Sequence, residues 1–215
     1  MMKSIFFGII ALMFAAVVMH QDQASAQLTD EAPSSTDKWD YMNRSCSAKL
    51  HDQINKEFNA ALFYMQYAAY FAQYQVNLPG FEKFFFNAAS EEREHGMKLI
   101  DYALMRGQKP IDSNTFKLQF SEQIQRPEPE QGSVALTALK AALAKEQEVT
   151  KSIRELIKIC EEDHNDYHLA DYLTGEFLEE QHQGQRDLAG KITMLSKMLK
   201  TNPKLGEFIF DKQNM

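Results

Sequence analysis

The segment from Asn87 to Ile100 reads NAASEEREHGMKLI and combines a helix-forming composition with a glutamate and a histidine among its apolar residues. On a helical wheel, with about 100° between residues, the apolar positions of this helix centre on one face. Glu92 and His95 lie within about 40° of that centre. A charged side chain is costly to bury alone, so this pair requires a partner.

Hydrophobic periodicity predicts four long helices, and each of the other three brings a polar side chain toward its own apolar face. The predicted helices span about residues 43–75, 81–106, 134–160 and 166–199. Glu146 lies within about 20° of the apolar centre of the third helix, and Gln181 within about 50° of that of the fourth. In the first helix, Glu57 and Tyr64 share one flank of the apolar stripe. That stripe consists of Leu50, Ile54, Phe58, Leu62 and Met65.

The fourth helix contains a second glutamate–histidine pair, Glu179 and His182, whose spacing would complete a two-motif di-iron pattern. The apolar residues of this helix, however, centre nearly on the opposite face. They are Leu169, Leu173, Phe177, Leu188, Ile192 and Leu195. We therefore expect Gln181 to face the interior and the pair to face solvent.

The connections between the helices indicate their arrangement. Short connections join the first helix to the second and the third to the fourth, so each pair forms an antiparallel hairpin. Over twenty residues separate the second helix from the third, which is enough to return the chain to the other end. The sequence predicts an all-α four-helix bundle with one long crossover over residues 43–200, then a short C-terminal fifth helix and tail over residues 201–215. A cytokine bundle would need a second long loop.

The two cysteines lie near helix ends that this topology places together. Cys46 opens the first helix and Cys160 closes the third, so both lie at the same end of the bundle. A disulfide within the subunit is the favoured interpretation, if the Cα atoms lie about 4.4–6.8 Å apart. Two free buried thiols, or a bond to another subunit, remain alternatives.

Three inward carboxylates and one imidazole point to metal ions. The inward positions of the second and third helices offer no Lys or Arg that could neutralise the acids. Glu92 and His95, three residues apart, can bind one metal, and Glu92 can also bridge to a second metal held by Glu146. Carboxylate-rich ligation with one imidazole suits an exchangeable iron pair better than structural zinc.

The overall composition is that of an acidic globular protein. The 215 residues are 44% hydrophobic and 25% charged, with a formal net charge of −7. An acidic surface repels nucleic acid, so we expect no nucleic-acid partner.

The N-terminus has the features of a secretory signal peptide over residues 1–26. A short basic start precedes an apolar run from Ile5 to Met19, and the sequence ASA at residues 24–26 resembles a cleavage site. Cleavage would leave no membrane segment and a flexible tail over residues 27–42; an uncleaved anchor is the alternative. In the secretory pathway, Asn43 would be a candidate N-glycosylation site because it begins the sequence Asn-Arg-Ser.

Several motifs together resemble the ferritin family, specifically its heavy-chain type. They are INKEFNAALFY (54–64), EEREHGMKL (91–99), KEQEVTKSI (145–153), YHLADYLTGEFLEEQ (167–181) and LGEFIFDK (205–212). The signal peptide, NLPGF (77–81), DYLTGEFLEEQHQGQRDLAGK (171–191) and the two cysteines resemble the secreted type found in insects. The resemblance covers nearly all of the chain from about residue 45.

The resemblance implies a ferritin-like fold and a di-iron ferroxidase centre. Its ligands would be Glu57, Glu92 and His95 for one iron, with Glu92 bridging, and Glu146 for the second iron. Gln181 would form a hydrogen bond near the second iron, and Tyr64 would tune oxidation. The reaction would be oxidation of Fe(II) to Fe(III) by O2, followed by storage as ferric oxyhydroxide. The container would be a hollow 24-subunit shell, with ferritin light-chain homologues as further subunits.

Two surface motifs depart from the family pattern. The acidic pair of the family's iron uptake pore would be Asp171 and a residue at which this chain has Thr174, so we expect Asp171 to act, helped by Glu176. Mineral nucleation is implied for Glu91 and Glu94. Met97 stands where the family often has a third glutamate. An ordinary solvated face is the alternative interpretation of these two glutamates.

Two other functional classes remain as alternatives. One is a structural cage subunit whose centre is inactive. The other is a secreted helical signalling protein without metal, which the inward carboxylates oppose.

Overall fold

A computed structural model describes residues 42–109, 117–118 and 128–215 of the chain. The expected signal peptide, and the N-terminal tail up to residue 41, lie outside these residues. The elements are α2 (Arg44–Ala72), α3 (Pro79–Met105), α4 (Val134–Glu162), α5 (Tyr167–Leu173), a π-helical turn (Thr174–Leu178), α6 (Glu179–Leu199) and α7 (Pro203–Gln213). The predicted four-helix bundle with a short fifth helix is confirmed.

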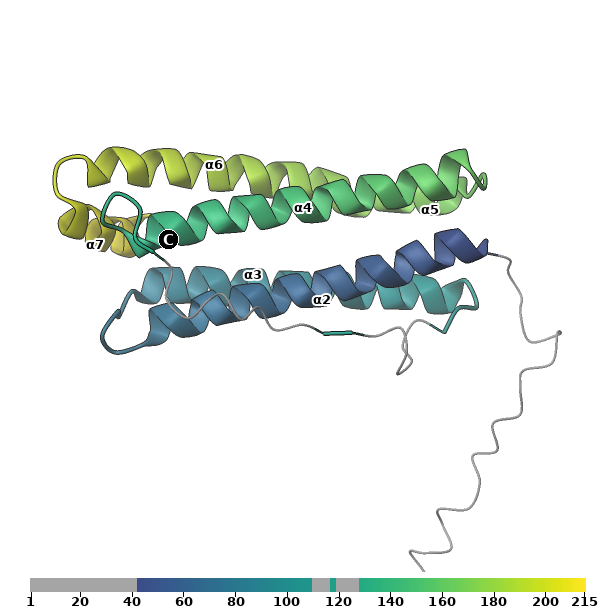
Figure 1. The fold of residues 1–215 in the computed structure, drawn as a ribbon, viewed down its shortest axis with the longest axis horizontal. Coiled ribbons are helices and arrows are strands. Elements are labelled where there is room, and N and C mark those ends of the chain that lie inside the picture. The colour runs from purple at the N-terminus through teal and green to yellow at the C-terminus, as the bar shows by residue number, and fades with distance from the viewer. Residues whose placement is uncertain (1–41, 110–116, 119–127) are drawn as a thin grey trace, which may run out of the picture. The chain divides into compact units, whose positions relative to one another are not determined.

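The helices pair as the connection lengths predict. Figure 1 shows α2 beside α3, and α4 beside the rod that α5, the π-helical turn and α6 form. The described part of the crossover lies along α2, where the backbone N–H of Lys117 donates to Oδ1 of Asn55 at 2.7 Å. The backbone oxygen of Lys117 accepts from Nδ2 of Asn59 at 3.4 Å. Residues 117–118 of the crossover therefore lie against the first hairpin.

Side-chain caps fix where the helices begin. Oδ1 of Asn43 accepts from the backbone N–H of Ser45 at 2.9 Å, and the hydroxyl of Ser133 accepts from that of Leu136 at 3.1 Å. The first helix ends at Ala72, three residues before the predicted end. The chain then reverses through a turn in which Asn77 has a φ of 49°, a left-handed conformation that a continuing helix excludes.

The sequence predicts one continuous fourth helix over about residues 166–199. The structure instead interrupts it with a π-helical turn at Thr174–Leu178. The hydroxyl of Thr174 donates to the backbone oxygen of Ala170 at 2.7 Å in this region. Residues spaced by four move gradually around the axis of an α-helix. A π turn rotates through a smaller angle per residue than an α turn, so it offsets this movement. As a result, Phe177 and Gln181 both face the interior, and Gln181 is only 5% exposed.

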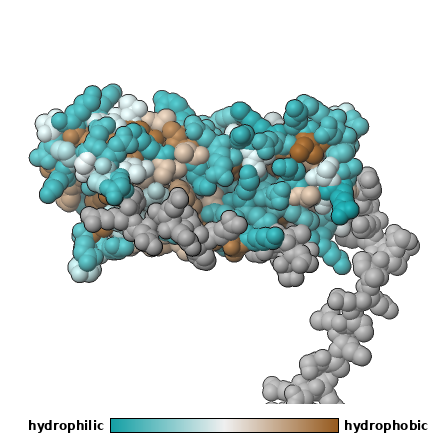
Figure 2. Space-filling model, in the orientation of Figure 1, coloured by the Kyte–Doolittle hydropathy of each residue, from teal (hydrophilic) through white to brown (hydrophobic). Residues whose placement is uncertain are grey.

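Two hydrophobic clusters fill the bundle on either side of a polar middle. One cluster is rich in aromatic rings, with Phe71 stacked on Phe85 at 5.6 Å and Phe81 stacked on Phe210 of α7 at 5.8 Å. The other is mainly aliphatic and ends at the cysteines. Outward faces are mostly hydrophilic on the side drawn in Figure 2. The polar residues between the clusters are therefore enclosed by apolar packing at both ends.

The favoured disulfide is present. Cys46 and Cys160 are bonded, with Sγ atoms 2.06 Å apart and Cα atoms 5.1 Å apart. Both side chains are fully buried. The bond ties the start of α2 to the end of α4, so the alternatives of free thiols and an intersubunit bond are wrong for this pair.

Candidate metal centre

Three ionisable side chains converge in the polar middle of the bundle. Glu57 of α2 is 0% exposed, and Glu92 and His95 of α3 are 3% and 6% exposed. One ligand atom from each lies within 4.8 Å of the others. Oε2 of each glutamate and Nδ1 of His95 have no hydrogen-bond partner among the described residues. Such atoms are suited to a shared cation.

Without a cation, the negative charges of these acids are unfavourable. Burial raises the pKa of Glu57 well above its usual range, and the nearby charge of Glu92 raises it further. Burial, followed by the charge of Glu146, likewise raises the pKa of Glu92. No Lys or Arg among the described residues forms an ion pair with these two glutamates. A metal ion would supply the missing positive charge.

Glu146 of α4 supplies a second acidic group beside the first three. It is half-buried, and its two carboxylate oxygens accept from two different side chains. The hydroxyl of Tyr64 donates to Oε1, and Nε2 of Gln181 donates to Oε2 at 2.8 Å. Burial, and then the charge of Glu146, raise the pKa of Tyr64, so its hydroxyl remains a donor. The predicted set from four helices is thus brought together.

Hydrogen bonds behind Gln181 fix the direction of its amide. Its Oε1 accepts from the hydroxyl of Thr150 at 2.7 Å, which leaves Nε2 to face Glu146. The oxygen of Thr150 in turn accepts from Nε2 of Gln185 at 2.6 Å. The sequence analysis missed Thr150 and Gln185, because a threonine and a glutamine beside an apolar stripe give no distinct signal.

Two further neighbours of the centre were also missed. Nε2 of Gln53 donates to Oε1 of Glu57 at 2.7 Å, and the separation of four residues on one helix face could have indicated this pair. Glu180 lies 3.2 Å from Nε2 of His95. With that nitrogen protonated and donating to Glu180, Nδ1 keeps its lone pair for a ligand. Both residues orient the candidate ligands.

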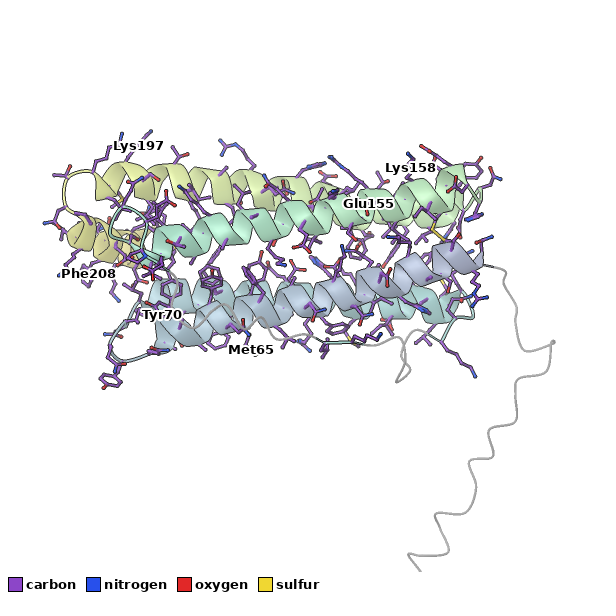
Figure 3. The ribbon with its side chains drawn as sticks, viewed as in Figure 1. Met65, Tyr70, Glu155, Lys158, Lys197 and Phe208 are labelled. Carbon is purple, nitrogen blue, oxygen red and sulfur yellow. A yellow bond between two sulfur atoms is a disulfide. The ribbon has the colours of Figure 1, made fainter. Side chains whose placement is uncertain are left out.

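The position of Glu57 corrects the helical wheel. Glu57 and Tyr64 were expected on the flank of the apolar stripe, but both are buried at the centre of the inward face. Met65 of the supposed stripe is instead 47% exposed and points away from the bundle (Figure 3). The outward positions of Glu179 and His182 agree with the expectation, since both are exposed.

A cavity of about 340 Å³ adjoins the centre between α3 and α6. Glu92, His95, Glu146 and Gln181 form part of its wall. Three further acids line it: Glu91, Glu180 and Asp187. Burial, followed by the charge of Glu180, raises the pKa of Glu91. The cavity thus offers cations an acidic approach to the centre.

The residues implied for the pore and for nucleation lie away from the centre or at its edge. Asp171 and Thr174 are exposed on α5 and the π-helical turn. Glu176 is exposed, and one of its oxygens lies 4.0 Å from Nζ of Lys98. Glu94 and Met97 are exposed on α3.

No helix among the described residues is long and apolar enough to cross a membrane. Asn43, the candidate glycosylation site, is half-buried at the start of α2.

Known proteins share this sequence and this fold. Residues 47–198 match the family model of the ferritin-like domain. The chain is 56% identical over 215 residues to the ferritin heavy chain of Aedes aegypti, covering 100% of both chains. It is 44% identical over 205 residues to that of Drosophila melanogaster, covering 95% of this chain and 98% of that one.

A solved structure agrees with these relatives. The crystal structure of the secreted ferritin of Trichoplusia ni matches with a TM-score of 0.77 and 46% identity. The match covers 87% of this chain and 96% of that chain. The chain belongs to the ferritin family.

Proposed function

We propose that the chain is the ferroxidase subunit of an iron-storage cage. It would oxidise Fe(II) to Fe(III) with O2 and store the product as a ferric oxyhydroxide mineral. One observation carries the proposal: Glu57, Glu92 and His95 are buried, and each keeps a ligand atom that has no hydrogen-bond partner in the part of the chain that the structure describes. Burying such a cluster of ionisable groups is energetically unfavourable unless cations bind to it during the reaction.

In this proposal, iron is the substrate and the side chains divide between two positions. Glu57, Glu92 and His95 would hold the first Fe(II). Glu146 would hold the second, and Glu92 would bridge the two ions. Two Fe(II) ions supply two electrons to O2, and anionic oxygen ligands favour the Fe(III) product.

The surrounding hydrogen bonds support this division of roles. Gln181 holds Glu146 from one side, and Tyr64 holds it from the other. These contacts fix the orientation of the Glu146 carboxylate while iron ions bind and dissociate. Ligands that neighbouring groups orient in this way bind metal more tightly. The ligand set leaves room for O2 and for the departure of Fe(III).

The path of iron is proposed from surface and cavity charges. Fe(II) would enter the cage near Asp171, with help from Glu176, despite Thr174 at the usual second acid. An Asp171→Ala cage that takes up Fe(II) at the wild-type rate would contradict this role. Fe(III) would leave through the acidic cavity, and Glu91 and Glu94 would start mineral growth. The acidic lining of the cavity supports the passage of iron cations between the centre and the surface.

Assembly into a 24-subunit shell, with light-chain homologues as partners, is part of the proposal. Support comes from an apolar hollow of about 170 Å³ on the outer side of α2 and α3. Its wall includes Phe58, Leu62, Met65, Phe86 and Leu118. A contiguous apolar surface of this kind commonly marks a protein interface.

We also propose that the protein works in the secretory pathway and is secreted. The disulfide supports this, because such bonds persist in oxidising compartments. The similar Trichoplusia ni protein is a secreted ferritin.

Stopped-flow measurement of Fe(II) oxidation by O2 tests the catalytic proposal. We expect Glu92→Ala and Glu146→Ala to lower the initial rate about 10-fold or more, because each removes a ligand. Glu155→Ala is the matched control, since Glu155 is an exposed glutamate on α4. Equal rates in all four proteins would rule out catalysis at this centre and leave a structural cage subunit.

A further inference from the structure

A chain of aromatic rings leads from the candidate metal centre toward α5, and the proposed function does not use it. The ring of His95 lies 5.5 Å from that of Phe177 in the π-helical turn, measured between centroids. The ring of Phe177 lies 5.8 Å from that of Tyr172. Tyr172 in turn stacks on Tyr102 at 4.6 Å. Each ring contacts the next, so this row of rings offers a short, continuous route for electron transfer.

The row of aromatic rings ends at a tyrosine–histidine pair. Tyr102 is 4% exposed, and its hydroxyl oxygen lies 2.9 Å from Nδ1 of His168. A tyrosine that loses an electron also loses its phenolic proton, so a neighbouring imidazole favours the oxidation by accepting that proton. His168 is exposed and can pass the proton to solvent.

The charge next to this pair is balanced. Nη1 of Arg106 donates to the hydroxyl of Tyr102 at 2.8 Å. The same guanidinium donates two hydrogen bonds to the carboxylate of Asp166, both at 3.0 Å. The pairing lowers the electrostatic cost of forming a protonated imidazole close to an arginine.

We propose that this aromatic chain delivers an electron from Tyr102 to the metal centre when hydrogen peroxide is reduced there, leaving a tyrosyl radical beside His168. The inference rests on the proposed function, which supplies both reactants. Two Fe(II) ions give two electrons to O2, which takes up two protons to form one hydrogen peroxide.

The proposed step balances in electrons and protons. Reduction of one hydrogen peroxide to two water molecules breaks the O–O bond and takes up two electrons and two protons. One electron comes from an Fe(II) ion, which becomes Fe(III), and the other comes from the phenol of Tyr102. The phenolic proton passes to His168, and solvent supplies the net second proton.

The step would protect the protein and its surroundings. When Fe(II) alone supplies a single electron to hydrogen peroxide, the other half of the molecule leaves as a hydroxyl radical. A second electron from Tyr102 avoids that product and moves the oxidising equivalent to a site near the surface, where external reductants can reach it.

Freeze-quench electron paramagnetic resonance tests the inference. The protein is loaded anaerobically with Fe(II) and mixed with hydrogen peroxide, and a spin trap reports hydroxyl radical in a parallel sample. We expect a tyrosyl signal in the wild type that falls more than twofold in Tyr102→Phe, which loses the phenol, and in Tyr172→Leu, which interrupts the row of rings. The hydroxyl-radical adduct should rise more than twofold in both variants. Tyr102→Phe keeps the ring and removes only the hydroxyl, so the packing around Tyr102 is preserved.

Two further variants refine the test. His168→Phe keeps a ring but removes the proton acceptor, so it should lower the tyrosyl signal as well. Tyr167→Phe is the matched control, because Tyr167 lies on the same helix but is 62% exposed and should leave the signal unchanged.

The outcomes separate this inference from the proposed function. A signal that persists in Tyr102→Phe and Tyr172→Leu, or that disappears only in Tyr64→Phe, overturns the aromatic route. The rate of Fe(II) oxidation by O2 is measured in the same preparations. A Glu92-dependent rate without a Tyr102-dependent radical overturns this inference alone. A rate that does not depend on Glu92 overturns the proposed function and this inference with it.

Discussion

At the scale of single residues, the direction of one amide decides which group Gln181 presents to the centre. Reversed, the amide would turn its oxygen toward Glu146, and two acceptors would face each other. The hydroxyl of Thr150 prevents this by occupying the amide oxygen, and Gln185 fixes the hydroxyl in turn. Orientation therefore depends on residues that touch no candidate ligand.

Replacing Thr150 with valine should disturb this arrangement at nearly constant volume. We expect Thr150→Val to slow Fe(II) oxidation about 10-fold, in the range typical of residues that orient metal ligands. Thr193→Val is the control, because Thr193 is exposed on α6 and its hydroxyl donates to the backbone oxygen of Ala189. Stopped-flow rates of both variants and the wild type check the expectation. A wild-type rate in Thr150→Val would mean that Gln181 holds its direction without the hydroxyl.

The buried glutamates also predict how stability depends on pH. The raised pKa of Glu57 means that the folded, metal-free protein keeps a proton that the unfolded chain loses above about pH 4.3. Folded protein then binds more protons than unfolded protein, so the free energy of unfolding falls as the pH rises toward neutrality. Glu57→Gln should flatten this dependence, because an amide does not titrate.

Thermal unfolding of metal-free protein between about pH 5 and pH 8 measures this effect. Glu155→Gln, at an exposed position on α4, serves as the control and should behave as the wild type. If metal-free wild type became more stable with rising pH, while Glu57→Gln did not differ from it, burial of Glu57 would not govern the dependence.

The residues of the centre were predictable to different degrees. Glu92 and His95 stand out because their helix has one clear apolar face, and both are buried there. Glu57 was placed less well because α2 has apolar side chains on two faces. A helical wheel places Met65 on the interior face, although its side chain is 47% exposed. The wheel uses the sequence of one helix alone and contains no information on which neighbouring element each face contacts. The sequence named the side chains that meet in the polar middle, but the face of α2 that carries Glu57 was identified only by the tertiary contacts.

At the scale of the elements, the π-helical turn brings two parts of one rod into the same interior. Helix content and connection lengths followed from periodicity, Pro-Gly breaks and caps, all of which are local signals. The π turn has no comparable local signal, because its widening depends on how α5 and α6 pack against α4. That is why the sequence placed Gln181 about 50° from the apolar centre, whereas the structure buries it.

The disulfide joins elements that are far apart in the chain, since the two cysteines are separated by 114 positions in the sequence. Closing so long a loop restricts the unfolded chain strongly, so a double Cys46→Ala, Cys160→Ala variant should lose about 2–5 kcal/mol of stability. Urea unfolding at neutral pH measures the loss. The metal centre lies away from the bond, so the rate of Fe(II) oxidation at room temperature should stay near that of the wild type. An unchanged unfolding midpoint would contradict the stabilising role.

At the scale of the whole molecule, α2 carries a second apolar face that packing within a single chain does not explain. The interior of the bundle is already filled by the two hydrophobic clusters. Met65 and Phe86 are 47% and 42% exposed, and both line the hollow between α2 and α3. Exposed apolar area of this kind lowers solubility unless another surface covers it. A second subunit is the covering that the proposed shell supplies.

Charges placed on this face should therefore disrupt assembly without unfolding the subunit. We expect Met65→Glu combined with Phe86→Glu to shift the protein from the cage to much smaller species, because each carboxylate would have to be buried in the interface. Size-exclusion chromatography with light scattering gives the mass, and circular dichroism checks the helix content. Tyr74→Glu is the control, since Tyr74 is 86% exposed in the turn after α2 and should leave the mass unchanged. A full-sized cage formed by the double variant would show that subunits meet through another face, because two buried charges in a subunit contact cost several kcal/mol at each copy.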